Sequence, residues 1–359
     1  MSIRPRRSLE NPALTRPSAL SSVPRSPDHL WLDKNENVDP EMAEVLQRVS
    51  QGLPPIALGT YPEAGELYRK LAAWLQVEAN SLLLTPGSDG AIRLTFEAFV
   101  EHGDAVVHTS PTFAMYPVYS QMFGADEVAI DYKPGIDGPV IEVASILDTI
   151  RERRPKLLCI PNPDSPTGTV LSPDVLGEIL AACENAGTVL LLDEAYHPFY
   201  EWTAVPWTAK SPNLIVARTF AKAWGAAGLR IGYAVAHPET IRLLHKMRPM
   251  YEVSTFAVDF MTGMLDRVDE MRKSVARIAA GKQYFVGEMR SLGYRVLPTH
   301  GNFVHVAFGA KGASIHAALK KRVLYRRDFD HPSLAGFSRF TVAPMPVMTE
   351  LAGLIRQSS

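Results

Sequence analysis

Short apolar runs alternate with helical patterns along most of the chain. From residue 64 onward, stretches such as AGELYRKLAAWL repeat apolar residues at the three- and four-residue spacing of an amphipathic helix. Between them lie apolar runs short enough to be buried strands: SLLL, DAVVHT, EVAIDY, KLLCIP, TVLLLDEAY and NLIVART. This alternation predicts an α/β fold in which helices cover both faces of a mostly parallel sheet.

The pattern changes near residue 246. A long helical stretch, VARIAAGKQYFVGEMRSLG, is followed by YRVLP, NFVHVAF and FSRFTVA as strands around one helix. We therefore expect a smaller α+β domain over residues 246–359, after a large domain over residues 29–245 whose first segment contributes to the small one. Residues 1–28 are rich in Pro, Ser and Arg and predict an extended arm that gains order only against something else, such as a second subunit.

Composition argues against a nucleic-acid-binding, membrane or disulfide-bonded protein. The 37 basic and 38 acidic residues nearly cancel, and no Lys or Arg run is long enough to follow a nucleic-acid backbone or an anionic membrane. Cys159 and Cys183 each stand alone in an apolar stretch, which is typical of core residues in a reducing compartment rather than of a disulfide or a metal site. Without an apolar signal region or an 18-residue apolar run, the sequence predicts a cytoplasmic protein.

Two turns that follow predicted strands carry residues with possible chemistry. In TPGSDGAIRLTF, the backbone N–H groups of Ser88 and Asp89 open a helix and could bind a phosphate, although a plain strand-to-helix turn explains them as well. In TVLLLDEAYHPFY, Asp193 ends a buried strand and could pair with a protonated ring nitrogen, or it could simply cap the next turn.

A third turn, RTFAKAWGAAGLRIGYAVA, surrounds Lys222 with small and apolar neighbours. Such a setting can desolvate an ammonium group and lower its pKa, so that the neutral amine attacks a carbonyl. Thr219 and Arg230 on either side would form the second half of a phosphate site. The alternative is a surface lysine with its stem against the helix.

Taken in order, the motifs identify a family. They are LDKNEN, YPEAGE, PGSDGAI, SPTFAMYP, SPTGT, LDEAY, RTFAKAWGAAGLRIGY, GNFVHV, RRDFDHP and SRFTV. In spacing and order the chain resembles the fold-type I pyridoxal-phosphate aminotransferases, of the branch that contains histidinol-phosphate aminotransferase. The resemblance covers nearly everything after the arm.

The resemblance implies a role for each matching residue. Lys222 would form the internal aldimine with pyridoxal 5'-phosphate and later move a proton between the substrate α-carbon and C4' of the cofactor. Asp193 would pair with the ring nitrogen, and Tyr196 would bind the phenolic oxygen. The other implied cofactor contacts are Ser88, Asp89, Phe113, Ser165, Thr219, Arg230 and, from the neighbouring subunit of a homodimer, Tyr61. The implied substrate contacts are Asn35, Arg327 and Arg339.

Three positions depart from the family pattern. Ser165 stands where the family has an Asn that donates to the phenolic oxygen, Gly90 replaces a frequent Glu, and residues 1–30 lack the substrate-binding Tyr of the arm. The sequence therefore predicts an aminotransferase that moves an amino group between an L-amino acid, such as glutamate, and a small oxo compound. It also predicts that histidinol phosphate is not the best substrate.

Other functions stay open at this point. A decarboxylase of the threonine-phosphate type belongs to the same branch and would share Lys222, Asp193 and Arg230. A non-enzymatic module with this fold would be expected to lose the Lys or the Asp, or to carry a helix-turn-helix, and neither departure is seen. A nicotinamide oxidoreductase would require a glycine fingerprint after its first strand, which the sequence lacks.

Overall fold

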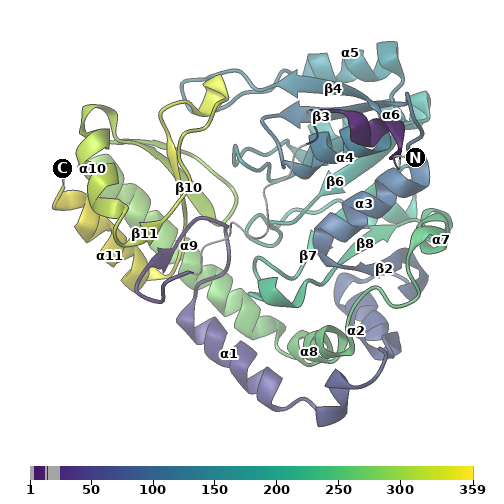
Figure 1. Cartoon of the computed structure of the whole chain (residues 1–359), viewed down its shortest axis with the longest axis horizontal. Coiled ribbons are helices and arrows are strands. Elements are labelled where there is room, and N and C mark those ends of the chain that lie inside the picture. Colours follow the sequence, from purple (N-terminus) through teal and green to yellow (C-terminus); the bar gives the residue numbers. More distant parts are fainter. Residues whose placement is uncertain (1–3, 13, 15–24, 359) are drawn as a thin grey trace.

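The computed structural model describes residues 4–12, 14 and 25–358. Its larger part surrounds a seven-stranded sheet with the strand order β2-β8-β7-β6-β5-β3-β4 (Figure 1). Strands β7, β6, β5, β3 and β4 run parallel to one another, which confirms the predicted mostly parallel sheet. The strands are β2 (Leu82–Thr85), β3 (Ala105–Ser110), β4 (Asp126–Asp131), β5 (Leu157–Pro161), β6 (Val189–Asp193), β7 (Leu214–Thr219) and β8 (Gly232–Ala236).

The central strands are mostly apolar because both faces of the sheet are covered. In β5, Leu158 and Ile160 point into one hydrophobic cluster, whereas Leu157 and Cys159 point into the other. The first cluster is completed by α1 (Pro40–Gln51), α2 (Gly65–Leu75), α5 (Val143–Arg153), α6 (Pro173–Ala186) and α8 (Thr255–Leu265). The second is completed by α3 (Gly87–Phe99), α4 (Met115–Phe123) and α7 (Pro238–Met247).

Both cysteines are unpaired and buried in these clusters, as predicted for core residues. Burial raises the pKa of the Cys183 thiol to about 12. Among the residues that the structure describes, no helix combines the length and the apolar character needed to cross a bilayer.

Strand β8 was not predicted from the sequence. It lies between β2 and β7 and is antiparallel to both. Gly232 allows this strand to approach the turn before α3, because a Cβ atom there would lie 2.7 Å from the backbone nitrogen of Ser88. β8 therefore brings the end of the Lys222 segment against the predicted phosphate turn.

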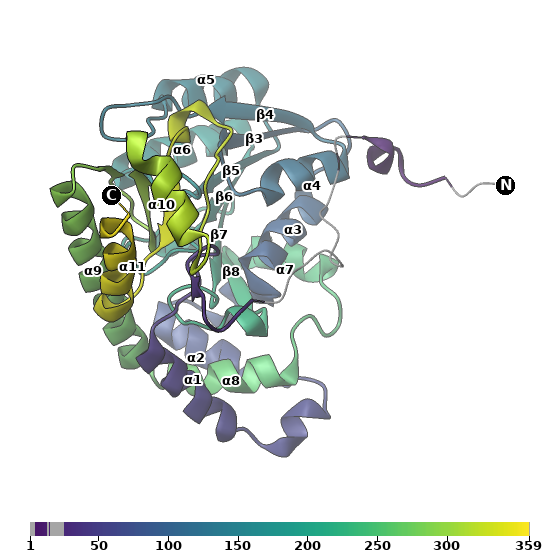
Figure 2. The same cartoon turned by 60° about the vertical axis from the view of Figure 1, so that its left-hand side comes forward.

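The smaller part contains a three-stranded antiparallel sheet in the order β12-β10-β9. Its elements are α9 (Val268–Ser291), β9 (Arg295–Leu297), β10 (Phe303–Ala307), α10 (Gly312–Leu319), β12 (Ser338–Thr341) and α11 (Met345–Arg356). Near the N-terminus, β1 (Leu30–Trp31) pairs in parallel with β11 (Val323–Leu324), so the segment before α1 lies beside the small domain (Figure 2).

Helix α9 contributes residues to two hydrophobic cores. Helix α8 packs against α1 and α2, and Met271, at the start of α9, still belongs to the core of the large sheet. Ile278, two turns further along α9, belongs to the core of the small domain. Helix α9 is therefore shared by the two cores.

Only part of the predicted arm is described. The 3-10 helix η1 (Arg7–Glu10) lies against α4, where the Ser8 hydroxyl donates to the Met122 carbonyl over 2.8 Å. Arg25 pairs with Asp33 and Glu36 at 2.8 and 2.6 Å. Residues 15–24 lie outside the described part of the chain.

Candidate active site

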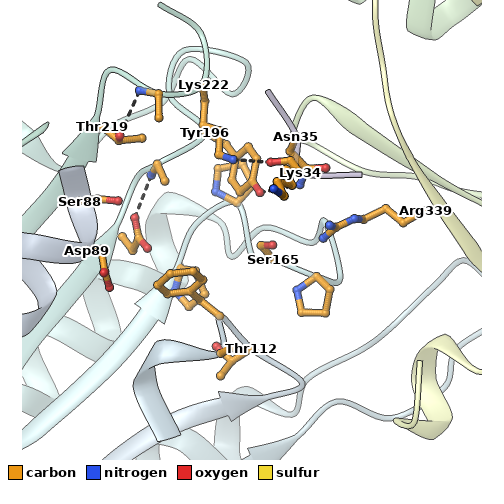
Figure 3. Close-up of a pocket in the computed structure, with 18 of the residues that line it drawn as sticks. Lys34, Asn35, Ser88, Asp89, Thr112, Ser165, Tyr196, Thr219, Lys222 and Arg339 are labelled. Atoms are coloured by element: carbon orange, nitrogen blue, oxygen red, sulfur yellow. Dashed lines mark hydrogen bonds between the residues drawn. The ribbon is translucent and has the colours of Figure 1, made fainter. Parts of the chain in front are cut away.

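A cavity of about 510 Å³ opens where three parallel strands end (Figure 3). Pro161, Asp193 and Thr219 are the last residues of β5, β6 and β7, and all three line it. Arg326 and Arg339 line it from the small domain. In open α/β sheets ligands bind beyond the carboxyl ends of the strands, which is where the cavity lies.

The cavity collects most of the residues selected from the sequence. Those that line it are Asn35, Ser88, Asp89, Phe113, Ser165, Asp193, Tyr196, Thr219, Lys222, Arg230 and Arg339. Tyr61 and Arg327 do not line it.

Lys222 follows β7 and carries its amine into this cavity. Its Nζ donates to the backbone carbonyl of Lys34 over 2.8 Å and lies 5.8 Å from the centre of the Tyr196 ring. Its chain neighbours Ala221 and Ala223 are buried. The amine is thus held by a backbone carbonyl at the edge of the cavity, where it can face an electrophilic carbon.

Asp193 is buried at the floor of the cavity. Its Oδ1 accepts the backbone N–H of Ala195 at 3.0 Å, so the residue does cap the next turn. Its Oδ2 accepts the Tyr116 hydroxyl at 3.1 Å. Burial raises the pKa of this carboxyl group to about 6, a penalty that a cationic partner in the cavity would reverse.

Tyr116 contacts Asp193 and was not predicted from the sequence to lie at the site. It belongs to the motif SPTFAMYP, lies on α4 and is fully buried. Burial and the neighbouring Asp193 keep the pKa of its hydroxyl well above the ordinary value, so it remains a hydrogen-bond donor to the carboxylate.

The turn before α3 has the geometry of an anion site. Gly87 has a φ of +76°, and a Cβ atom there would lie 2.9 Å from Nη2 of Arg230. The Arg230 guanidinium therefore lies directly on this turn. Ser88 and Asp89 belong to the first turn of α3, whose N–H groups have no partner within the helix. A guanidinium beside a helix N-terminus fits a phosphate dianion.

The side chains of Asp89 and Thr219 are compatible with a phosphate site at this turn. Tyr119 on α4 donates to Oδ1 of Asp89 over 3.0 Å, which binds the carboxylate to α4. The hydroxyl oxygen of Thr219 accepts the N–H of Ala221 at 3.1 Å and keeps its own hydrogen for a ligand.

Tyr196 is positioned by Asn35. The Asn35 amide donates to the Tyr196 hydroxyl over 2.8 Å, which leaves the hydroxyl hydrogen free to donate into the cavity (Figure 3). Asn35 is buried, has a φ of 56° and is itself held by Thr341. Asn35, which the family resemblance implies as a substrate contact, thus lines the cavity and also supports Tyr196.

Asn162 does not take the place of the Asn that the family has at position 165. Its Oδ1 accepts the N–H of Leu171 over 2.8 Å, and the residue does not line the cavity. Ser165 does line it, with a side chain too short to match an Asn. Tyr196, with its hydroxyl group, lines the same cavity.

Two arginines mark the other end of the cavity. Arg339 is buried over the Phe303 ring, 5.3 Å from its centre, and donates to the carbonyl of Asp33 over 3.1 Å. Its Nε is buried and has no hydrogen-bond partner among the described residues. Arg326 pairs with Arg339 in an antiparallel bridge and lines the same cavity. Neither guanidinium has a carboxylate partner in the described chain, which leaves both for an anionic ligand.

Arg327 and Tyr61 lie elsewhere. Arg327 pairs with Asp328 at 3.0 Å, so the arginine at the cavity is its neighbour Arg326. Tyr61 is 72% exposed and stacks on Tyr251, with the ring centres 4.2 Å apart.

Comparisons with known proteins agree on one family. The family model for class I and II aminotransferases matches residues 27–354. The histidinol-phosphate aminotransferase of Caldanaerobacter subterraneus is 31% identical over 330 residues, which cover 91% of this chain and 92% of that protein. Histidinol-phosphate aminotransferase 1 of Bradyrhizobium diazoefficiens is 30% identical, over 93% of this chain and 94% of that protein. The crystal structure of histidinol-phosphate aminotransferase from Sinorhizobium meliloti in complex with pyridoxal-5'-phosphate has a TM-score of 0.79 at 24% identity, and covers 92% of this chain and 90% of that one.

Proposed function

Because the chain belongs to the class I and II aminotransferase family, we propose that it moves the amino group of an L-amino acid such as glutamate to a small anionic oxo compound. It is a pyridoxal 5'-phosphate-dependent enzyme of the branch that contains histidinol-phosphate aminotransferase. The observation that carries the proposal is one cavity in which the Lys222 amine, the buried Asp193 carboxyl group and the Arg339 guanidinium meet.

Each of these residues has a task that its surroundings support. Bound pyridoxal phosphate supplies an electrophilic carbon and an electron-withdrawing ring. The Lys222 amine would hold the cofactor at that carbon and would serve as the base that moves the substrate's α-proton. Asp193 would pair with the protonated ring nitrogen, and the Tyr196 hydroxyl would donate to the phenolic oxygen. Phe113 would pack on the ring and restrict its orientation.

Phosphate and substrate are held at opposite ends of the cavity. Ser88, Thr219 and Arg230 bind the phosphate through N–H, O–H and guanidinium donors. Arg339 binds the carboxylate of the amino donor as a bidentate pair, and Arg326, rather than Arg327, adds the second cation. Two arginines without carboxylate partners favour a substrate with more than one negative charge.

A half-reaction screen tests this function. Glutamate, other amino acids and amino alcohol phosphates are added singly to the cofactor-loaded enzyme, and its absorption spectrum is followed. Glutamate should convert the enzyme faster than histidinol phosphate, because the missing Tyr of the arm weakens the binding of histidinol phosphate by about 1–3 kcal/mol, which is about 5- to 150-fold.

The same screen separates the competing reactions. Fastest conversion by histidinol phosphate would show that the sequence departures at Ser165, Gly90 and the arm do not set the substrate. Release of carbon dioxide would replace transamination by decarboxylation. A protein that takes up no pyridoxal phosphate would contradict the proposed function altogether.

A homodimer with Tyr61 reaching the partner's phosphate is part of the proposal. Tyr61 lies outside the cavity of its own chain and stands in an exposed apolar group. The other members are Ile56, Leu58, Met250 and Tyr251. Exposed apolar groups of this kind mark protein interfaces. The two unpaired, buried cysteines support the cytoplasm as the proposed compartment.

Mixing two inactive variants tests the shared site. In a heterodimer of Lys222→Ala and Tyr61→Phe subunits, one composite site has both native residues. Full exchange should therefore restore about one quarter of the native sites. Each variant incubated with itself is the control, and exchange is verified by mass. Absence of recovery after exchange would place Tyr61 outside the partner's site.

A further inference from the structure

Lys282 in α9 holds its ammonium inside the protein, and no acidic side chain among the described residues pairs with it. Its Nζ donates to the carbonyls of Thr299 and Gly301 over 2.6 and 2.8 Å. Burial alone acts on this group and lowers its pKa to about 8. Burying this charge costs free energy, which the two hydrogen bonds to the carbonyls offset, and these bonds tie α9 to the segment that carries the carbonyls.

The two carbonyls belong to a short segment, Thr299–Phe303, that leads from β9 into β10 and touches the large domain. The N–H of His300 donates to the carbonyl of Gly168 over 2.8 Å. The amide of Asn302 donates to the carbonyl of Asn35 over 3.1 Å. We call these five residues the 299–303 segment.

The 299–303 segment supports the cofactor end of the site through Tyr196. Asn35, held by the segment, donates to the Tyr196 hydroxyl over 2.8 Å. The Phe303 ring packs edge-on against the Tyr196 ring at 5.4 Å between centres. At Gly301 the approach is so close that a Cβ atom would lie 3.1 Å from the Tyr196 ring.

The same segment supports the substrate end. The Arg339 guanidinium rests on the Phe303 ring, 5.3 Å from its centre. Phe303 on β10 pairs with Thr341 on β12. This pairing fixes the position of Phe303 along the sheet relative to Arg339, which also lies on β12. Any shift of the segment would therefore move both Tyr196 and Arg339.

We propose that Lys282 is a positioning residue, which fixes the 299–303 segment and thereby sets the placement of Tyr196 and Arg339 for transamination. It contacts neither substrate nor cofactor itself. The inference rests on the proposed function, in which Tyr196 donates to the phenolic oxygen and Arg339 binds the substrate anion.

The experiment compares Lys282→Met and Lys282→Arg with the unmodified, cofactor-loaded enzyme. The control is Lys273→Met on the same helix, because Lys273 is exposed and pairs only with Glu270. For each protein, KM for glutamate, kcat and the pH midpoint of the colour change are measured.

Lys282→Met should raise KM by about tenfold, with a smaller fall in kcat, since small misplacements of binding groups are costly. It should also move the colour midpoint upward by about half a pH unit, because a weaker donor at the phenolic oxygen favours the protonated form. Lys282→Arg should recover most of both changes, and Lys273→Met should show neither.

A Lys282→Met enzyme that loses thermal stability but keeps the KM and the midpoint of the control would overturn the inference and leave Lys282 a structural residue. If Lys282→Met does not fold, Lys282→Gln is measured in its place, and an unchanged midpoint there overturns it equally. These outcomes leave the proposed function intact. Failure of the unmodified protein to bind pyridoxal phosphate would instead remove the proposed function and this inference with it.

Discussion

Replacing Lys222 with Ala is expected to abolish both the yellow colour and the turnover of the purified protein. The Lys222 amine lies in the cavity between Tyr196 and the Lys34 carbonyl, and it would supply both the covalent link and the base. A positioned base contributes about 10²–10⁴-fold, so a loss of about 10³-fold or more is expected. Borohydride reduction of the loaded enzyme, followed by peptide mapping, should find the cofactor on Lys222.

Two comparisons make this result specific. Lys210→Ala removes an exposed lysine outside the cavity and should leave colour and rate unchanged. Lys34, whose backbone carbonyl holds Lys222, also lines the cavity, so its own amine is the competing candidate. Cofactor attached to Lys34 or to any lysine except Lys222 would refute the assignment.

The sequence predicts the large sheet well because burial leaves a strong local signal there. Each of the six apolar runs corresponds to a strand, from β2 to β7, since strands covered on both faces are mostly apolar; the edge strand β4, DEVAID, is the exception and is largely exposed. Strand β8 carries the same apolar signal in GYAVA, but this run directly follows the glycine-rich Lys222 segment and belongs to the same motif. Its antiparallel direction depends on its neighbours and leaves no local pattern.

The residues of the site also fall into two groups. Some are placed by the local sequence, and others by contacts with residues far away in the chain. Lys222, Asp193 and the turn at Ser88 each follow a strand, and the parallel sheet alone brings such turns to one edge. The choice between Arg326 and Arg327 depends on which one pairs with Arg339, and neighbouring residues of an extended segment point in opposite directions. The contact between Tyr116 and Asp193 likewise depends on the packing of α4 on the sheet.

Asp193→Ala and Asp193→Asn are expected to slow the single-turnover reaction by about 10²-fold or more, in the range that loss of a preorganised electrostatic group produces. Cofactor affinity should change much less, because the phosphate end, with Arg230 and the turn at Ser88, is untouched. Stopped-flow spectra give the rate, and equilibrium titration with pyridoxal phosphate gives the affinity.

The pair of variants separates the charge of Asp193 from its capping role. Asn keeps an oxygen that can accept the Ala195 N–H, whereas Ala removes both the cap and the charge. If the charge acts on the ring nitrogen, the two variants should be slowed alike. A slow Ala variant beside a nearly normal Asn variant would make Asp193 a structural cap.

In the cofactor-free protein, the buried Asp193 carboxyl group should lower the free energy of unfolding, and the size of this effect should depend on pH. Burial raises the pKa of Asp193 from 3.8 to about 6, so between these values the folded chain binds the proton more tightly than the unfolded chain. Its contribution to the free energy of unfolding therefore falls as the pH rises through this window, by about 3 kcal/mol in total at about 1.4 kcal/mol per pKa unit. Asp193→Asn removes the titrating group, so the cofactor-free variant should gain melting temperature relative to the unmodified protein between about pH 4 and pH 7. A difference in melting temperature that stays constant over that range would mean that burial does not raise the pKa of Asp193 in the cofactor-free protein.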